Sequence, residues 1–247
     1  MSSGLASRLK ALGLRVAQEF FWGWYILFLL LLAGLVRIRR EGHRPRPPCV
    51  LAVTHVSGYG FDPLFVTWAS RHFRGFALYS MDRPGRMARF LAQSFWRFGV
   101  TQDPERKKEI NPKTLEAATE FLKRGGSLQV FPEGERFWER RLYAGAALLA
   151  RRAQVPLIPV GLENAPTYEP EALGLPVWRG VLRALLKTVQ KRWIGVHFAP
   201  PIWPDPSLPE EDDVDRMMRE LERVFDAFYR KFYGIPGPLW INPKRAG

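Results

Sequence analysis

The sequence predicts a single layered α/β domain that follows an N-terminal hydrophobic helical membrane anchor. Two observations lead to this fold class. Apolar, strand-like runs alternate with helical segments over most of the chain, which is typical of α/β layered folds. Ahead of them lies a long uncharged segment, Phe20 to Val36. We therefore expect membrane-anchoring helices over residues 1–40, an α/β domain over 48–235 and a C-terminal tail over 236–247.

The uncharged segment from Phe20 to Val36 has the composition of a membrane-embedded helix. As a helix it would span about 25 Å, slightly less than the roughly 30 Å hydrocarbon core of a bilayer. Tryptophans, which favour the headgroup level, lie near its start, and arginines follow its end between residues 37 and 46. Before it, apolar residues recur every three or four positions with basic residues between them, as in an amphipathic helix with a basic face. We favour a two-helix anchor that dips into one leaflet; a single span, a cleaved signal peptide and a buried core helix are the alternatives.

The domain after the anchor is expected to contain several strands with helices between most of them. A link rich in arginine and proline, Arg39 to Pro48, separates it from the anchor. The clearest helix runs from Pro112 to Lys123, with Asn111 as its N-cap and a Gly-Gly pair after it. Another follows the acidic residues 210–213, from which an apolar stripe continues to Phe232. The predicted strands are Val50–Val53, Gly75–Tyr79, Ser127–Phe131, Leu157–Leu162 and Trp193–Phe198.

The charge balance of the chain indicates an anionic partner. Lysine and arginine number 37 against 24 aspartate and glutamate residues, a net charge of +13. Such a surface favours nucleic acid, anionic lipid or a polyanionic substrate. The chain has no zinc-finger spacing and no interleaving of aromatic with basic residues on a strand. Nucleic acid is ranked last, because it would explain the charge but not the seventeen uncharged residues from Phe20 to Val36. The single cysteine, Cys49, excludes an intrachain disulfide and a cysteine-based metal cluster.

Polar residues of catalytic type follow two of the predicted strands. The apolar run that ends at Phe131 continues as Pro-Glu-Gly-Glu-Arg over residues 132–136. Glycine allows the backbone to approach a ligand closely, and arginine offers a planar fork of donors suited to phosphate. The run that ends at Val53 leads to His55, with Asp62 shortly after. Together the two strand ends suggest one site for acyl or phosphoryl chemistry; ordinary polar residues at the edge of a core are the alternative.

Four segments of the domain occur in the order of a known set of motifs. The clear ones are Thr-His-Val-Ser at 54–57 with Asp-Pro-Leu at 62–64, Phe-Pro-Glu-Gly-Glu-Arg at 131–136 and Val-Pro-Leu-Ile-Pro-Val at 155–160. In this order they resemble the lysophospholipid acyltransferases, membrane-bound enzymes of the 1-acylglycerol-3-phosphate acyltransferase type. The resemblance covers roughly Val50 to Asn164. It implies an α/β acyltransferase domain with no metal and no tightly bound cofactor.

The resemblance implies that His55 is the general base and that Asp62 orients and stabilises its imidazole. The hydroxyl that the base activates would attack the thioester of acyl-CoA or acyl-carrier protein directly, without an enzyme nucleophile. In the family four residues separate the two side chains, whereas here six do. We expect a bulged turn at Gly58–Gly60 to restore the pair; the alternative is a broken pair in a catalytically inactive, membrane-binding relative.

The same resemblance assigns the acceptor side of the site. Glu133, Gly134 and Arg136 would belong to the pocket for the glycerol-phosphate portion of the acceptor, with Arg136 as the phosphate fork. Arg106 is the best match to the arginine of the second motif. Glu135 replaces the usual Thr or Ser, and a carboxylate that points inward would repel phosphate.

These assignments imply a substrate and a location. We expect lysophosphatidic acid as the membrane lipid acceptor and phosphatidic acid as the product. Because of Glu135, another lipid or glycolipid hydroxyl is the alternative acceptor. The enzyme would work on an anionic membrane surface, with its active site on the cytoplasmic side.

The other histidines offer no better base. His43 and His72 lie in arginine-rich surroundings, and His197 ends a strand with no acid expected near it. We therefore expect His55 to be the catalytic histidine.

Overall fold

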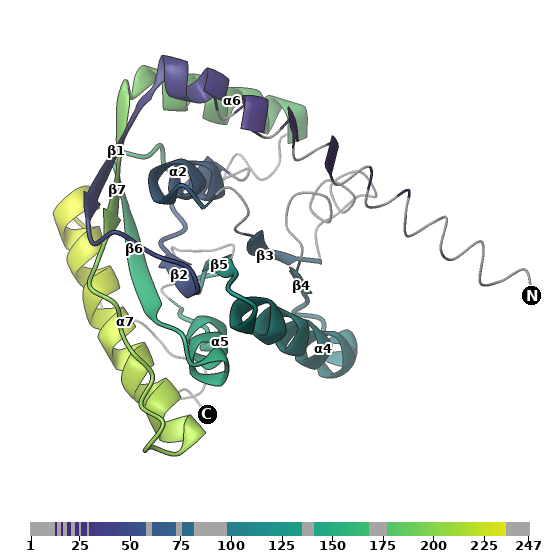
Figure 1. Cartoon of the computed structure of the whole chain (residues 1–247). Coiled ribbons are helices and arrows are strands. Elements are labelled where there is room, and N and C mark those ends of the chain that lie inside the picture. Colours follow the sequence, from purple (N-terminus) through teal and green to yellow (C-terminus); the bar gives the residue numbers. More distant parts are fainter. Residues whose placement is uncertain are drawn as a thin grey trace, which may run out of the picture.

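In a computed structural model of the protein, the residues that the structure describes form a seven-stranded sheet with helices on both faces (Figure 1). The structure describes residues 30–57, 61–72, 76–81, 98–134, 141–167 and 177–235, together with helical positions between 13 and 28. The strands are β1 (Arg37–Gly42), β2 (Cys49–Val53), β3 (Phe76–Ser80), β4 (Phe98–Val100), β5 (Ser127–Val130), β6 (Leu157–Glu163) and β7 (Trp193–Phe198). Their order in the sheet is β1-β7-β6-β2-β5-β3-β4. Only β6 and β7 pair antiparallel, so β1 and β7 run opposite to the other strands.

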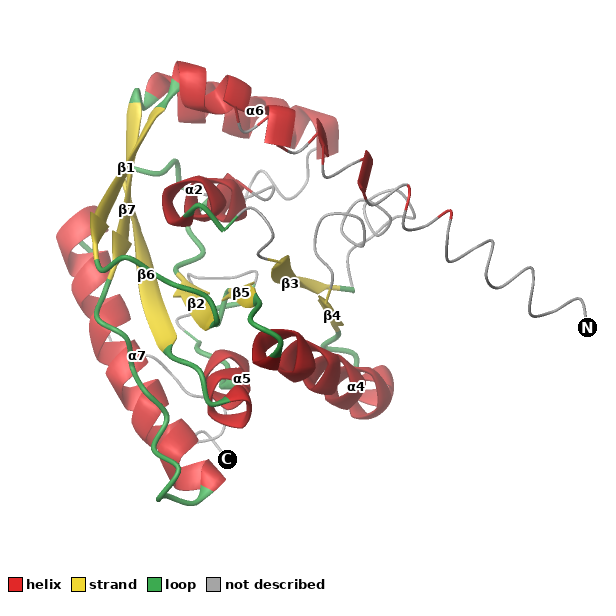
Figure 2. Cartoon of the chain, viewed as in Figure 1, coloured by secondary structure: helices red, strands yellow, loops and turns green. Residues whose placement is uncertain are grey.

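The helices form two layers around this sheet (Figure 2). Those with described bounds are α2 (Phe61–Ser70), α4 (Pro104–Lys123), α5 (Gly145–Ala153), α6 (Val177–Gln190) and α7 (Glu210–Tyr233). On one face α4 contacts α5 and α5 contacts α7, whereas α2 packs against β1 and β7 on the other. The predicted α/β class is therefore confirmed.

The central strands are apolar because both of their faces are covered. Every residue of β2 and β5 is buried, and β6 is buried up to its last residue. Strands covered on both faces read as continuous apolar runs rather than as alternating patterns. This explains why the two ends of each of these three strands could be predicted from the sequence to within one residue.

The first strand, β1, was not predicted. Its sequence is rich in arginine and mostly exposed, and it was assigned to the anchor and to the link from Arg39 to Pro48. Instead it is an edge strand that pairs in parallel with β7, from Arg37 opposite Trp193 to Gly42 opposite Phe198. Charged side chains are common on edge strands, where they discourage pairing with other chains. The sheet therefore begins at residue 37, and the expected link is wrong.

The start of α4 was also predicted wrongly. The helix begins at Pro104, and the side chain of Asp103 caps it by accepting from the backbone N–H of Glu105 at 3.0 Å. Asn111 lies within the helix, and its side chain bonds the backbone of Thr101 in both directions, at 2.9 and 3.0 Å. Pro112 is tolerated inside the helix because it lies on the exposed side, where water can satisfy the carbonyl left without a donor. The predicted C-terminal end at Lys123 is confirmed.

The described N-terminal residues between 13 and 35 are helical. Leu32 is buried in the core, whereas Phe20, Trp24, Leu31 and other large apolar side chains on this segment are more than half exposed. None of the helices among the described residues is long and apolar enough to cross a membrane.

The C-terminal helix, α7, carries the apolar stripe expected from the sequence. Its buried side chains include Met217, Leu221 and Phe225. At its N-terminal end the fully buried Asp213 pairs with Arg151 of α5 at 3.0 Å and with Arg216 at 2.6 Å. The pair with Arg151 joins the start of α7 to α5, whereas Arg216 lies on α7 itself.

Candidate active site

Two neighbouring strands bring the polar residues of the candidate site together. β2 and β5 are parallel and adjacent, so their C-terminal ends lie at the same edge of the sheet. His55 follows β2 and Glu133 follows β5, and the backbone N–H of His55 donates to Oε2 of Glu133 at 2.6 Å. Ligand sites in open α/β sheets typically form at this edge.

His55 and Asp62 form a hydrogen-bonded pair. Nδ1 of His55 lies 2.7 Å from Oδ2 of Asp62, and their side chains are 16% and 0% exposed. Asp62 lies in the first turn of α2, and the backbone N–H of Ser57 donates to both of its carboxylate oxygens at 3.0 Å. The longer spacing between the two residues therefore does not prevent the contact. The expected glycine turn, residues 58–60, lies outside the described residues.

The surroundings of Asp62 decide how it acts on the histidine. Burial raises the pKa of Asp62, while the hydrogen bonds from His55 and Ser57 oppose that rise. The first turn of a helix also favours negative charge. A carboxylate that accepts from Nδ1 holds the ring proton on that nitrogen, so Nε2 becomes the nitrogen that can accept a proton. The partly exposed ring also lies beside Phe131, with 4.9 Å between the ring centroids.

The side chain of Glu133 is buried between the backbone of His55 and α7. It is 2% exposed. Its Oε2 accepts from the backbone of His55 and from the hydroxyl of Tyr229 at 3.0 Å. Burial is the main reason that the pKa of Glu133 is raised to about 7. The structure thus differs from the expected place of Glu133 in the glycerol-phosphate pocket, because its side chain runs inward to α7.

Gly134 is required by the turn that follows β5. Its φ is +70°, and its N–H donates to the carbonyl of Phe131 at 3.0 Å. A side chain in this left-handed conformation would be strained, and a Cβ would lie 3.4 Å from the ring of Tyr143. Glu135 and Arg136, including the predicted phosphate fork, lie outside the described residues.

Arg106 and His55 follow strands that are not neighbours in the sheet. It is exposed in the first turn of α4, which follows the edge strand β4. Two strands, β5 and β3, lie between β2 and β4. With neighbouring strands about 4.8 Å apart, a site that includes both His55 and Arg106 would extend over roughly 14 Å.

Two residues of this site were missed in the sequence. Ser57 anchors the loop after β2, since its hydroxyl donates to the carbonyl of Pro166 at 2.8 Å while its N–H bonds Asp62. Tyr229 comes from α7, far along the chain from Glu133. The sequence feature that could have identified Tyr229 is a tyrosine on the buried face of α7, because a buried hydroxyl needs a hydrogen-bond partner.

A second histidine–carboxylate pair lies on β6 and β7. Nε2 of His197 is 2.6 Å from Oε2 of Glu163, and the imidazole packs on Phe232 at a centroid distance of 4.5 Å. The expectation of no acid near His197 was therefore wrong. The two residues are distant in sequence, and the antiparallel register of β6 and β7 brings them together. Among the described residues, no group of three or more His, Cys, Asp or Glu side chains could hold a metal ion.

Neutralising Glu133 is expected to flatten the pH dependence of stability. The pKa of Glu133 is raised from 4.5 to about 7, so the folded state holds this proton more tightly than the unfolded state. Its contribution is fully present below pH 4.5 and is lost as the pH rises through about 7. At most it amounts to about 3 kcal/mol. Urea unfolding between pH 4.5 and 8 should show a smaller decline for Glu133→Gln than for the wild type. Glu116→Gln, on an exposed position of α4, is the control; equal slopes for Glu133→Gln and the wild type would refute the assignment.

Two comparisons with known proteins found matches for this chain. The family model described as Acyltransferase matches residues 17–163. Among solved structures, the chain is similar to the crystal structure of the 1-acyl-sn-glycerophosphate (LPA) acyltransferase, PlsC, from Thermotoga maritima, with 17% sequence identity and a TM-score of 0.48. That match covers 89% of this chain and 96% of the other. The search of curated proteins found no match. Because the family model spans more than half of the sequence and includes His55, Asp62 and Glu133, the chain belongs to the acyltransferase family.

Proposed function

We propose that this enzyme transfers a fatty acyl group from the thioester of acyl-CoA or acyl-carrier protein to the hydroxyl of 1-acylglycerol-3-phosphate, giving phosphatidic acid. The observation that carries the proposal is the contact of 2.7 Å between Nδ1 of His55 and Asp62. It orients an imidazole at the edge of the sheet with Nε2 as the proton acceptor. The motif order in the sequence and the membership of the acyltransferase family support the same chemistry.

The residues present can perform this reaction in two steps. Nε2 of His55 takes the proton of the acceptor hydroxyl as its oxygen attacks the thioester carbonyl, which forms the new C–O bond. The C–S bond then breaks, and the leaving thiolate takes the proton back from the imidazolium. Asp62 stabilises the imidazolium between these steps, since the carboxylate contacts the other ring nitrogen. Sulfur leaves as a thiol, and the histidine returns to its neutral form.

We place the enzyme on the cytoplasmic side of a membrane, with the residues before β1 as an in-plane anchor. The net charge of +13 and the exposed apolar side chains of the N-terminal helix support this location. The acceptor would then enter the site laterally from the leaflet. Gly134 and Arg136 would form the phosphate side of the acceptor pocket, and Arg106 would extend it.

A panel of acceptors tests the proposal. Purified full-length enzyme would be given labelled acyl-CoA or acyl-carrier protein, each with lysophosphatidic acid, lysophospholipids with larger headgroups, a glycolipid or a long-chain alcohol. We expect phosphatidic acid to be the main product. Preference for another hydroxyl acceptor would refute lysophosphatidic acid as the acceptor but would still support the acyl-transfer reaction. Absence of any product from the folded enzyme would refute the acyltransferase proposal.

A further inference from the structure

Much of the apolar face of helix α6 is exposed instead of packing on the core. The exposed fractions are 63% for Trp178, 48% for Leu182 and 55% for Leu186. These residues are four apart, so they lie on one face of the helix. Leu185 and Val189 border this stripe, and they are partly buried against the core. Core packing therefore does not account for the exposed stripe.

The remaining face of α6 is basic. Arg179, Arg183 and Lys187 also recur every four residues, and the helix contains no acidic residue. Lys191 and Arg192 follow directly and are exposed. An apolar stripe beside a basic stripe is the pattern of a helix that lies in the plane of an anionic membrane surface.

The exposed apolar stripe continues onto the N-terminal helix. The N-terminal helix leads into β1 and α6 leads into β7, and these strands are parallel neighbours with Arg37 opposite Trp193. The two helices therefore end at the same point, where the N–H of Arg37 donates to the carbonyl of Arg192 at 2.9 Å. Both run along the same side of the domain, at the top of Figure 1. Among the described residues, every exposed large apolar side chain except Trp203 lies on these two helices.

This side of the domain is also the side of the active site. β6 is antiparallel to β7, so its C-terminal end lies beside the start of β7. Asn164, which follows β6, donates from its side chain to the carbonyl of Trp193 at 2.8 Å. β2 is parallel to β6, so His55 follows a strand that ends at the same edge.

We infer that α6 is a second membrane-binding element, which lies on an anionic lipid surface beside the N-terminal helix and presents the His55 edge of the sheet to the leaflet. The inference rests on the proposed function, because delivery of a lipid acceptor is the reason for a second membrane contact. Charge favours lipid over a second copy of the chain as the occupant. A symmetric contact through α6 would set Arg179 and Arg183 of one copy against the same residues of the other.

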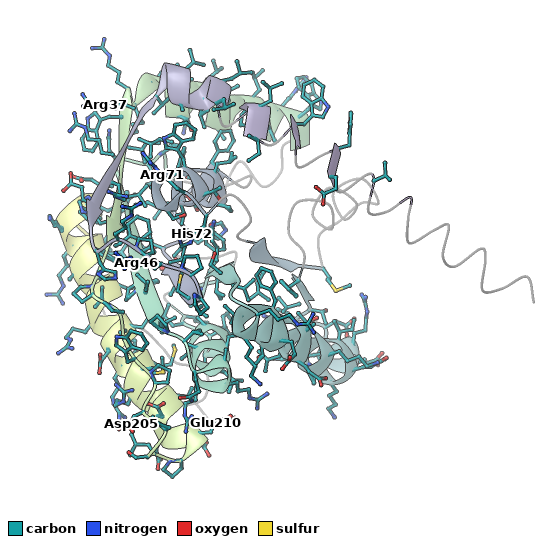
Figure 3. The ribbon with its side chains drawn as sticks, viewed as in Figure 1. Arg37, Arg46, Arg71, His72, Asp205 and Glu210 are labelled. Atoms are coloured by element: carbon teal, nitrogen blue, oxygen red, sulfur yellow. The ribbon has the colours of Figure 1, made fainter. Side chains whose placement is uncertain are left out.

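A probe on α6 tests the contact directly, whatever the affinity of the N-terminal helix. Cys49 is fully buried, and burial raises the pKa of its thiol to about 12, so a cysteine added on the surface would be the one that reacts. An environment-sensitive fluorophore would be attached to the full-length Leu182→Cys variant. The matched control is Trp203→Cys, since Trp203 is 60% exposed. The control position is two residues before Asp205, which lies at the end of the molecule opposite Arg37 in Figure 3.

With vesicles of phosphatidylcholine and phosphatidylglycerol, the probe at position 182 should shift to the blue and be quenched by lipids with spin labels in their acyl chains. The probe at position 203 should not change. In protein that carries no fluorophore, Trp178→Ser should weaken partitioning into vesicles by about tenfold relative to Trp203→Ser. Arg179→Gln should weaken it by about fivefold, and only when anionic lipid is present.

Equal responses at positions 182 and 203 would overturn the inference, as would failure of the wild type to sediment with vesicles. A blue shift at position 182 that depends on protein concentration and not on lipid would show self-association instead, and would also overturn it. Activity on acceptor dispersed in detergent separates the two proposals. We expect Trp178→Ser to keep that activity, whereas a wild type inactive on every dispersed acceptor would refute the proposed function alone.

Discussion

Replacing His55 with alanine is expected to lower kcat for acyl transfer by about 10²- to 10⁴-fold. The loss follows from the geometry, because Nδ1 is held by Asp62 and the other ring nitrogen is left to take the proton of the acceptor hydroxyl. Steady-state kinetics with labelled acyl donor would measure it. Vesicle binding should be unchanged, since the imidazole is not part of the exposed apolar surface.

The second histidine–carboxylate pair provides a matched control. His197 is 13% exposed and bonded to Glu163 at 2.6 Å, so it resembles His55 in burial and in its partner. His197→Ala should therefore disturb packing to a similar extent, while kcat stays within a few-fold of the wild type. If His55→Ala retained activity, or if both variants lost it equally, the assignment of His55 as the base would be wrong.

Replacing Asp62 with asparagine is expected to lower kcat by a similar factor, about 10²- to 10⁴-fold. The carboxylate accepts from Nδ1 of His55 and from the N–H of Ser57. An amide has one oxygen and one NH₂ group. If the NH₂ faces the imidazole, the ring proton moves to Nε2 and the base is lost. In either orientation the negative charge that stabilises the imidazolium is gone.

A measurement of fold stability separates this role from a purely structural one. The thermal midpoint of unfolding of Asp62→Asn, compared with the assay temperature, shows whether the variant is folded when kcat is measured. A folded variant with wild-type kcat would exclude Asp62 as the partner of the base.

The fold class and the central pair of His55 and Asp62 could be predicted from the sequence. The strands β2, β5 and β6 were predictable because they are covered on both faces, and most residues of such strands are apolar. His55 and Asp62 were predictable because they lie close in sequence and match a family motif in order. The apolar composition of a strand and the short spacing of a motif are both local features, so they can be recognised without knowledge of the tertiary contacts.

Features that depend on contacts between distant segments could not be predicted from the sequence. β1 is charged and exposed, and only its hydrogen bonds to β7 make it a strand. Glu133 was expected to face the acceptor, but the hydroxyl of Tyr229, from a helix far along the chain, holds it under the histidine. Pairing and burial of this kind are set by which surfaces pack together, and no local pattern of apolar and polar residues records that choice.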